Sequence, residues 1–220
     1  MASTKDTVDK PKARNLPSRR FEIFANPEMN EQYTWQRADW SKATSGWEMS
    51  DLIEKYGEEE VRDKMTEVLK SYAGGMVITG LFHEGGMENR GKRPRKGCSL
   101  THIWVGPGFP LFRHSHPGSG DCLYYVTNGE LIVGRRSLGP GSGFFIPAGM
   151  PYKYTGGPNG AELLEFHPGG GDPDQPGLKV DERTMDSMQR LIDQANENRD
   201  KWHRPTRIGD TTRAEEATDD

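Results

Sequence analysis

Apolar residues recur at helical spacing in two parts of the chain. Within 50–72 they lie mostly three or four positions apart, and a segment at 181–202 shows a similar period. This spacing places them on one face of a helix. We therefore predict a helix near 50–72, with Gly57 as a break point, and another near 181–202. The apolar positions are Leu52, Ile53, Tyr56, Val61, Met65, Val68 and Leu69 in the first helix, and Met185, Met188, Leu191, Ile192 and Ala195 in the second.

Between these helices the pattern changes to short apolar runs. Each run within 76–168 is bounded by glycine, proline or asparagine, and the chain's 27 glycines and 15 prolines fit this punctuation. Short strands separated by turns at this spacing are typical of an all-β sandwich or barrel. The sequence thus predicts a mainly all-β fold, an antiparallel barrel with a helix on either side.

The two ends of the chain are polar. Residues 1–20 have mixed charge and no apolar period, which is typical of a disordered arm. Residues 21–47 carry many aromatic side chains, which we expect to wrap around the domain. The predicted division is a disordered arm at 1–20, an aromatic wrapping segment and helix at 21–75, a barrel at 76–170, a C-terminal helix at 181–203 and a disordered tail at 204–220.

Composition and charge exclude several classes of partner. The chain has 29 Lys and Arg against 33 Asp and Glu, a net charge of −4, so no basic face for nucleic acid is expected. No apolar run is long enough to cross a membrane, and no hydrophobic segment follows the charged N-terminus as in a secretory signal. Cys98 and Cys122 are too few for a disulfide framework. We expect reduced thiols in the cytoplasm, with a single disulfide as the open alternative.

One short motif carries candidate metal chemistry. His114 and His116 are two positions apart, so in a strand both side chains point to the same face. Two imidazoles held this way can bind a divalent metal such as Fe, Zn, Cu or Ni. An isolated pair of this kind is also compatible with two incidental surface histidines, and the residues that follow favour the metal site.

The segments around this pair resemble the two motifs of the cupin superfamily. Residues 108–129, GFPLFRHSHPGSGDCLYYVTNG, resemble the first motif, and residues 141–152, GSGFFIPAGMPY, resemble the second. The resemblance extends over about 76–168. It implies a double-stranded β-helix (cupin or jelly-roll) barrel that holds one metal ion, with two His and a Glu from the first motif and a His from the second.

The chain departs from this pattern at two ligand positions. Counting from either side puts Asp121 or Cys122 in the Glu position, so Asp121 is a candidate metal ligand and Cys122 is a soft ligand or a small buried residue. Tyr152 occupies the second His position. With a pKa near 10 in its ordinary state, Tyr152 fits a catalytic or substrate-orienting role better than a metal ligand, and a structural role stays open.

Further candidate residues lie on neighbouring strands. Alternation puts His167 on one face with Glu165, so His167 can complete the metal site or contact substrate. His102 and Trp104, on the strand before the first motif, are candidate substrate contacts. For both histidines a structural, hydrogen-bonded role is the alternative. The abundant aromatic residues indicate a pocket for a small organic molecule.

The resemblance implies a metal-dependent enzyme. We expect an Fe(II) dioxygenase that cleaves a C–C bond in a small ketone or aromatic compound, with Zn, Ni, Cu or Mn as alternative metals. A non-redox lyase or isomerase with a tyrosine base, and a cupin that binds a small molecule without catalysis, are the alternatives. Because single-barrel cupins commonly pair, we also expect a homodimer.

Overall fold

The computed structural model describes residues 44, 46–84, 97–205 and 208–209. The predicted disordered arm, most of the aromatic segment 21–47 and most of the predicted tail lie outside the described residues. The proposed domain division therefore stays a prediction.

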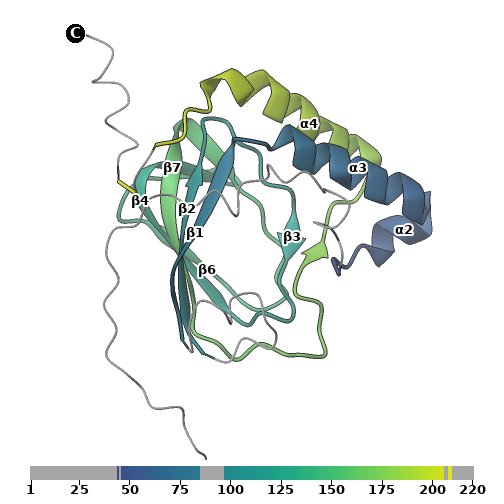
Figure 1. Ribbon diagram of the computed structural model, residues 1–220, viewed down its shortest axis with the longest axis horizontal. Helices are drawn as coiled ribbons and strands as arrows, with labels where there is room; N and C mark the ends of the chain where they lie inside the picture. The colour runs from purple at the N-terminus through teal and green to yellow at the C-terminus, as the bar shows by residue number, and fades with distance from the viewer. Residues whose placement is uncertain (1–43, 45, 85–96, 206–207, 210–220) are drawn as a thin grey trace, which may run out of the picture.

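The larger of two β-layers is a six-stranded antiparallel sheet (Figure 1). Five strands follow the order β1-β2-β7-β4-β5, and β6 also pairs with β4. The long central strands β4 and β7 run antiparallel and carry most of the residues discussed below. The strands are β1 (Met76–His83), β2 (Ser99–Val105), β4 (Cys122–Val133), β5 (Arg136–Leu138), β6 (Gly143–Ile146) and β7 (Thr155–His167).

A smaller layer lies opposite the inner face of this sheet (Figure 1). It consists of β3 (His114–Ser115) paired with β8 (Lys179–Val180). A single antiparallel bridge from His114 to Tyr152 and a parallel bridge from Glu48 to Lys179 extend it on either side. The described strands thus form the two layers of the predicted jelly roll, and the large sheet does not itself close into a barrel. Isolated bridges at Pro110–Thr155 and His114–Tyr152 connect the layers.

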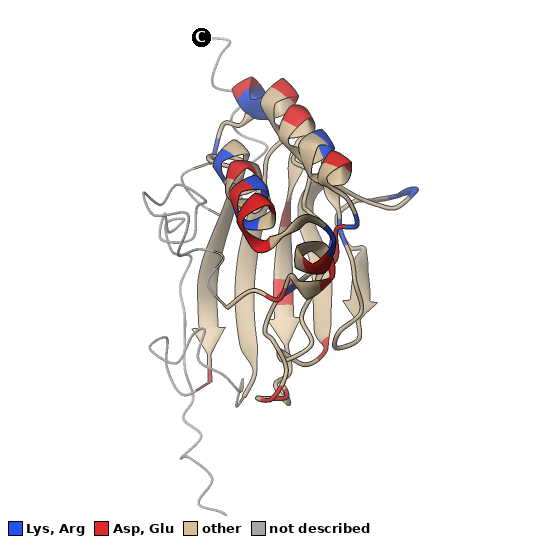
Figure 2. Ribbon diagram, turned by 90° about the vertical axis from the view of Figure 1, so that its right-hand side faces the viewer, with Lys and Arg blue, Asp and Glu red and all other residues tan. Residues whose placement is uncertain are grey.

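Helices cover one end of the two layers, where α3 and α4 pack side by side (Figures 1 and 2). The first predicted helix is split at Gly57, whose φ of 90° lies outside the helical region. Thr184 caps α4 by accepting a hydrogen bond from the Ser187 amide. The elements are α2 (Ser50–Tyr56), α3 (Glu58–Ser71), α4 (Met185–Asn198) and the 3₁₀ helix η3 (Arg199–Lys201).

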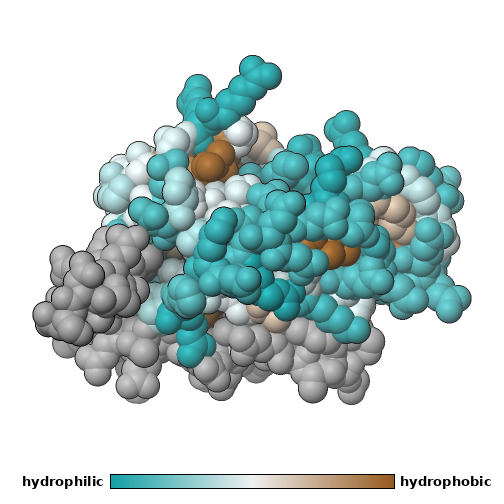
Figure 3. Space-filling view, turned by 90° about the horizontal axis from the view of Figure 1, so that it is seen from above, coloured by the Kyte–Doolittle hydropathy of each residue, from teal (hydrophilic) through white to brown (hydrophobic). Residues whose placement is uncertain are grey.

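The apolar face of each helix is buried, as its spacing predicts. Val61, Met65 and Val68 on α3 are fully buried, and so are Met188 and Ala195 on α4. Each such side chain contributes roughly 1.5–3 kcal/mol by leaving water. Charged residues of both signs occupy the outer helix faces, and this end of the molecule is mainly hydrophilic (Figures 2 and 3).

The predicted mainly β fold with flanking helices is confirmed. Both cysteines are free, so the alternative of a disulfide between Cys98 and Cys122 does not hold. None of the described helices is both long and apolar enough to span a bilayer.

Candidate metal centre

The two histidines of the first motif lie together on the inner side of the small layer. The ring centroids of His114 and His116 are 4.9 Å apart, and the ring planes are nearly perpendicular. The Nδ1 atom of His114 donates to the carbonyl of Phe112 at 2.9 Å, and that of His116 donates to the carbonyl of Gly177 at 2.8 Å. In a neutral ring this leaves the lone pair on Nε2, the orientation that metal-binding histidines adopt.

His114 is also held in the protonation state that a metal requires. Its side chain is buried, and burial together with the neighbouring His116 lowers its pKa from 6.5 to about 3. The ring is therefore neutral near pH 7. A metal does not have to displace a proton from this nitrogen, which makes His114 a competent ligand.

Tyr152 lies against the histidine pair, as the second motif indicates. Its ring centroid is 4.5 Å from that of His114 and 6.2 Å from that of His116. Its hydroxyl is 2.7 Å from the hydroxyl of Tyr124, which in turn donates to Oε1 of Glu165 at 3.1 Å. Because Tyr124 gives its proton to the carboxylate, Tyr152 is the donor in the bond between the two hydroxyls.

Both tyrosines are neutral in this environment. Burial is the main cause that raises the pKa of Tyr124 and of Tyr152 well above 10, and the charge of Glu165 adds to it. Without a metal, Tyr152 is thus a hydrogen-bond donor and a poor base. This favours the orienting role predicted for Tyr152 over a tyrosinate ligand.

Glu165 is the hub of a second group of donor atoms. Its Oε1 lies 2.8 Å from Nε2 of His167 and 3.8 Å from Sγ of Cys122. A carboxylate oxygen of Glu165, a ring nitrogen of His167 and Sγ of Cys122 all lie within 4.8 Å of one another. This spacing is compatible with a bound metal ion. Cys122, Tyr124, Glu165 and His167 meet because β4 pairs with β7 in a register that sets Tyr124 opposite Glu165.

The structure places Asp121 away from this group. Its side chain is exposed, and its Oδ1 accepts a hydrogen bond from the amide of Ala148 at 2.9 Å. Asp121 therefore braces the turn of the second motif from outside. Asp121 thus lies apart from the buried donor atoms, and its role as a metal ligand stays a prediction, whereas Glu165 is the carboxylate that contacts the site tyrosine Tyr124.

His102 and Trp104 also lie elsewhere. The register of β2 and β7 sets Thr101 opposite Glu165, so the alternate residues His102 and Trp104 point to the other face of the sheet. There, Nε2 of His102 lies 2.9 Å from Oε2 of the buried Glu162. His102 and Trp104 therefore do not lie at the predicted substrate pocket. His102 instead has the structural, hydrogen-bonded role that was the alternative.

Sequence reasoning missed the roles of Glu165 and Tyr124. The alternation along β7 already put Glu165 on the face of His167, a signal that could have identified it. Tyr124 had no such signal, because it resembles the other aromatic residues of the core. Its role follows from hydrogen bonds to two residues distant in the sequence.

Comparisons with known proteins give partial structural matches. No protein-family model and no curated protein matches the sequence. An RmlC-like cupin from Shewanella frigidimarina is 21% identical over 44% of this chain and 79% of its own, with a TM-score of 0.35. KdgF from Halomonas sp. is 19% identical over 43% of this chain and 79% of its own, with a TM-score of 0.34. The polyketide cyclase RemF from Streptomyces resistomycificus is 20% identical over 56% of this chain and 83% of its own, with a TM-score of 0.40.

The fold class follows from the chain itself. The paired antiparallel layers and the adjacent rings of the buried His114 and the half-buried His116 agree with the jelly-roll fold that the resemblance of the two sequence motifs implies. Two imidazoles and one carboxylate are a set that would suit non-haem iron and related divalent metals. Among the described residues, the three donor atoms that lie close enough to share one ion are those of Cys122, Glu165 and His167.

Proposed function

We propose that the protein is a metal-dependent cupin enzyme that acts on a small organic substrate. His114 and His116 would hold the metal together with Glu165, and His167 would orient the Glu165 carboxylate. The observation that carries this proposal is the orientation of both histidines by backbone carbonyls, together with a half-buried hydrogen-bond network that leads from Tyr152 to Glu165. Hydrogen bonds that fix the orientation of histidine rings in this way are typical of metal ligands.

The reaction that this donor set supports best is an Fe(II)-dependent dioxygenation with C–C cleavage in a small ketone or aromatic compound. A set of two His and one carboxylate leaves coordination positions open, as such iron enzymes require. When bound, the metal would supply the redox chemistry. Zn, Ni, Cu or Mn remain alternatives because the residues are not selective for one metal.

The protein's own residues would position the substrate. Tyr152, which is neutral and held by Tyr124, can donate a hydrogen bond to a substrate oxygen. Phe112, Phe144 and Tyr154 stack on or beside these residues and supply apolar walls that limit the entry of water. A small apolar ketone or aromatic ring suits such surroundings.

One observation favours a non-redox lyase or isomerase as the second candidate. The series Tyr152, Tyr124, Glu165 and His167 is continuously hydrogen bonded, so a proton taken from substrate has a route to a carboxylate and an imidazole. In that reaction the metal would act as a Lewis acid, as it does in other metal-assisted enzymes. Oxygen consumption separates the two candidates.

The test begins with protein purified without added metal. Elemental analysis should find about one transition metal per chain, and an oxygen electrode should detect uptake with 2,4-pentanedione or catechol as probe. The double variant His114→Ala/His116→Ala should lose both metal and uptake and keep its circular dichroism spectrum. Stoichiometric metal in that variant would overturn the site. Metal-dependent turnover of a probe without oxygen uptake would favour the lyase or isomerase, and metal without turnover would favour a binding protein.

We also propose that the protein forms a homodimer. A row of exposed apolar side chains crosses the outer face of the large sheet, where the strand register sets Phe145 on β6 and Phe166 on β7 opposite Leu123 on β4. Tyr125 lies exposed on the same face. Contiguous apolar surface of this kind commonly marks an interface. A cytoplasmic location, expected from the reduced cysteines, is likewise a proposal.

A further inference from the structure

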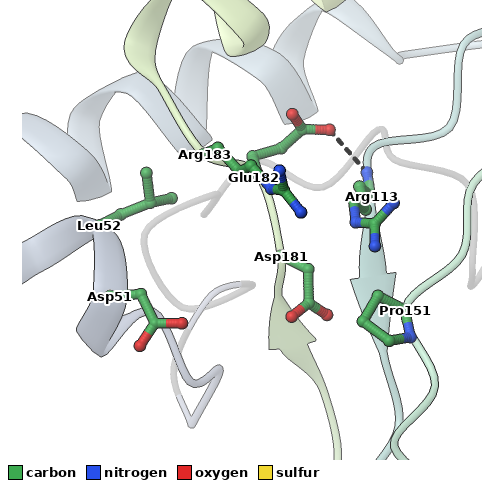
Figure 4. Close-up of a pocket in the computed structure, with 7 residues that line it drawn as sticks. All are labelled: Asp51, Leu52, Arg113, Pro151, Asp181, Glu182 and Arg183. Atoms are coloured by element: carbon green, nitrogen blue, oxygen red, sulfur yellow. Dashed lines mark hydrogen bonds between the residues drawn. The ribbon is translucent and has the colours of Figure 1, made fainter.

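A cavity borders the small layer, and Figure 4 shows the residues that line it. Its volume is about 320 Å³. His114 pairs with Val180 on β8, so their neighbours Arg113 and Asp181 point to the opposite face, and this face borders the cavity. The cavity is lined by Asp51, Leu52, Arg113, Pro151, Asp181, Glu182 and Arg183.

The cavity presents charges of both signs that lack partners. Figure 4 shows that Arg113, Arg183 and Asp181 are among the side chains that line it. Neither arginine forms an ion pair within the described part of the chain. Oδ2 of Asp181 is buried and has no hydrogen-bond partner among the described residues. Buried polar atoms in folded proteins are nearly always paired, so the unpaired Oδ2 of Asp181 points to a ligand. Arg113 is half-buried and Arg183 is exposed, so both guanidinium groups are accessible to it.

The other two acidic groups of the cavity are already engaged. Oε1 of Glu182 accepts a hydrogen bond from the backbone amide of Arg113 at 2.7 Å. The carboxylate of Asp51 is bonded to Nζ of Lys179 at 2.8 Å. The groups left for a ligand are therefore two guanidinium groups and one carboxylate, with Leu52 and Pro151 as apolar walls.

We propose that this cavity binds a short zwitterion that carries a carboxylate and an ammonium group. The ligand carboxylate would pair with Arg113 and Arg183, since guanidinium groups bind carboxylates through paired hydrogen bonds. The ammonium group would pair with Asp181. A metal ion fits less well because two cations already face the cavity, and a simple anion fits less well because the carboxylate of Asp181 repels it.

The cavity adjoins the candidate metal centre through the backbone. Arg113 precedes His114, and Pro151 precedes Tyr152. The amide of Asp181 donates to the carbonyl of Arg113 at 2.9 Å, which ties the two cavity strands together. Binding in the cavity does not depend on the proposed metal chemistry, so it can be tested whether or not the protein proves to be an enzyme.

The experiment is a calorimetric titration of the full chain with γ-aminobutyrate and 5-aminopentanoate. Butyrate, butylamine and inorganic phosphate are the singly functional comparisons. We expect saturable binding of at least one zwitterion, and at least about 10-fold weaker binding of all three comparisons, because each lacks one of the two complementary charges.

Variants locate the ligand. Asp181→Asn and Arg183→Gln should each weaken binding of the zwitterion by at least about 10-fold, because each removes one charged partner. Arg190→Gln, an exposed arginine on α4 that does not line the cavity, is the matched control and should bind normally. Thermal melting confirms that each variant is folded. Phosphate or butyrate binding as tightly as the zwitterion, unchanged binding in both cavity variants, or no saturation up to about 10 mM would each overturn the proposal.

Discussion

The hydroxyl of Tyr152 lies 2.7 Å from the hydroxyl of Tyr124 and donates its proton to it. This bond connects two groups that would otherwise be separate. The ring of Tyr152 packs at a tilt against that of His114, which belongs to the small layer, whereas Tyr124 belongs to the large sheet and contacts Glu165. The pair is thus the link between the histidines and the carboxylate of the candidate metal centre.

Removal of this link should impair turnover and leave the metal in place. In Tyr124→Phe, Tyr152 loses its acceptor and Glu165 loses a donor, so we expect turnover to fall by about 10–100-fold and the unfolding free energy to fall by about 1–3 kcal/mol. Tyr125→Phe is the matched control, because Tyr125 is the next residue on β4 and points outward. Elemental analysis and steady-state rates measure both effects. Equal losses in the two variants would contradict this role.

The carboxylate that binds the metal can be identified with two single variants. Glu165→Gln keeps the shape of the side chain and removes its charge, and we expect metal affinity to fall by at least about 10-fold. Asp121→Asn should retain the metal, since the Asp121 carboxylate is exposed and accepts a hydrogen bond from the amide of Ala148. Competition with a chromogenic chelator measures both affinities. Loss of metal in Asp121→Asn, with normal metal binding in Glu165→Gln, would show that Asp121 is the carboxylate ligand.

The metal-free protein should lose stability in acid. Burial sets the pKa of His114 at about 3 in the folded state, below the ordinary value of 6.5. Between these values the unfolded chain binds one more proton, so stability is lost as pH falls below about 6.5, by up to about 1.4 kcal/mol per pH unit from this residue. His114→Asn should reduce this loss.

Urea unfolding in the presence of a chelator, at about pH 7 and about pH 5, measures this change. His203→Asn alters an exposed histidine and is the control. A pH dependence that is the same in His114→Asn and in the unaltered chain would show that His114 does not govern it.

The proposed dimer has a directly measurable mass. Light scattering should give about twice the monomer mass of 24.7 kDa at micromolar concentration. Phe145→Lys places a charge in the exposed row and should yield monomers. Met150→Lys, at an exposed apolar residue in a turn outside the row, should stay dimeric. A monomeric mass for the unaltered chain would contradict the proposal.

Features that depend on neighbours in the sequence were predictable. Helical spacing located both helical regions and the break at Gly57, since a helix places its apolar face by local geometry alone. Strand alternation placed His114 with His116, and Glu165 with His167, for the same reason. The two motifs identified the fold class because they combine such local patterns with turn residues at set distances.

Features that depend on how distant strands pair were decided by the tertiary structure alone. A shift of one residue turns a side chain to the other face, so counting could not decide between Asp121 and Cys122, whereas the register of β4 with β6 and β7 turns Cys122 inward. The same long-range register turns His102 away from the site and brings Tyr124 to Glu165. Such pairing joins residues tens of positions apart, and local periodicity holds no information about it.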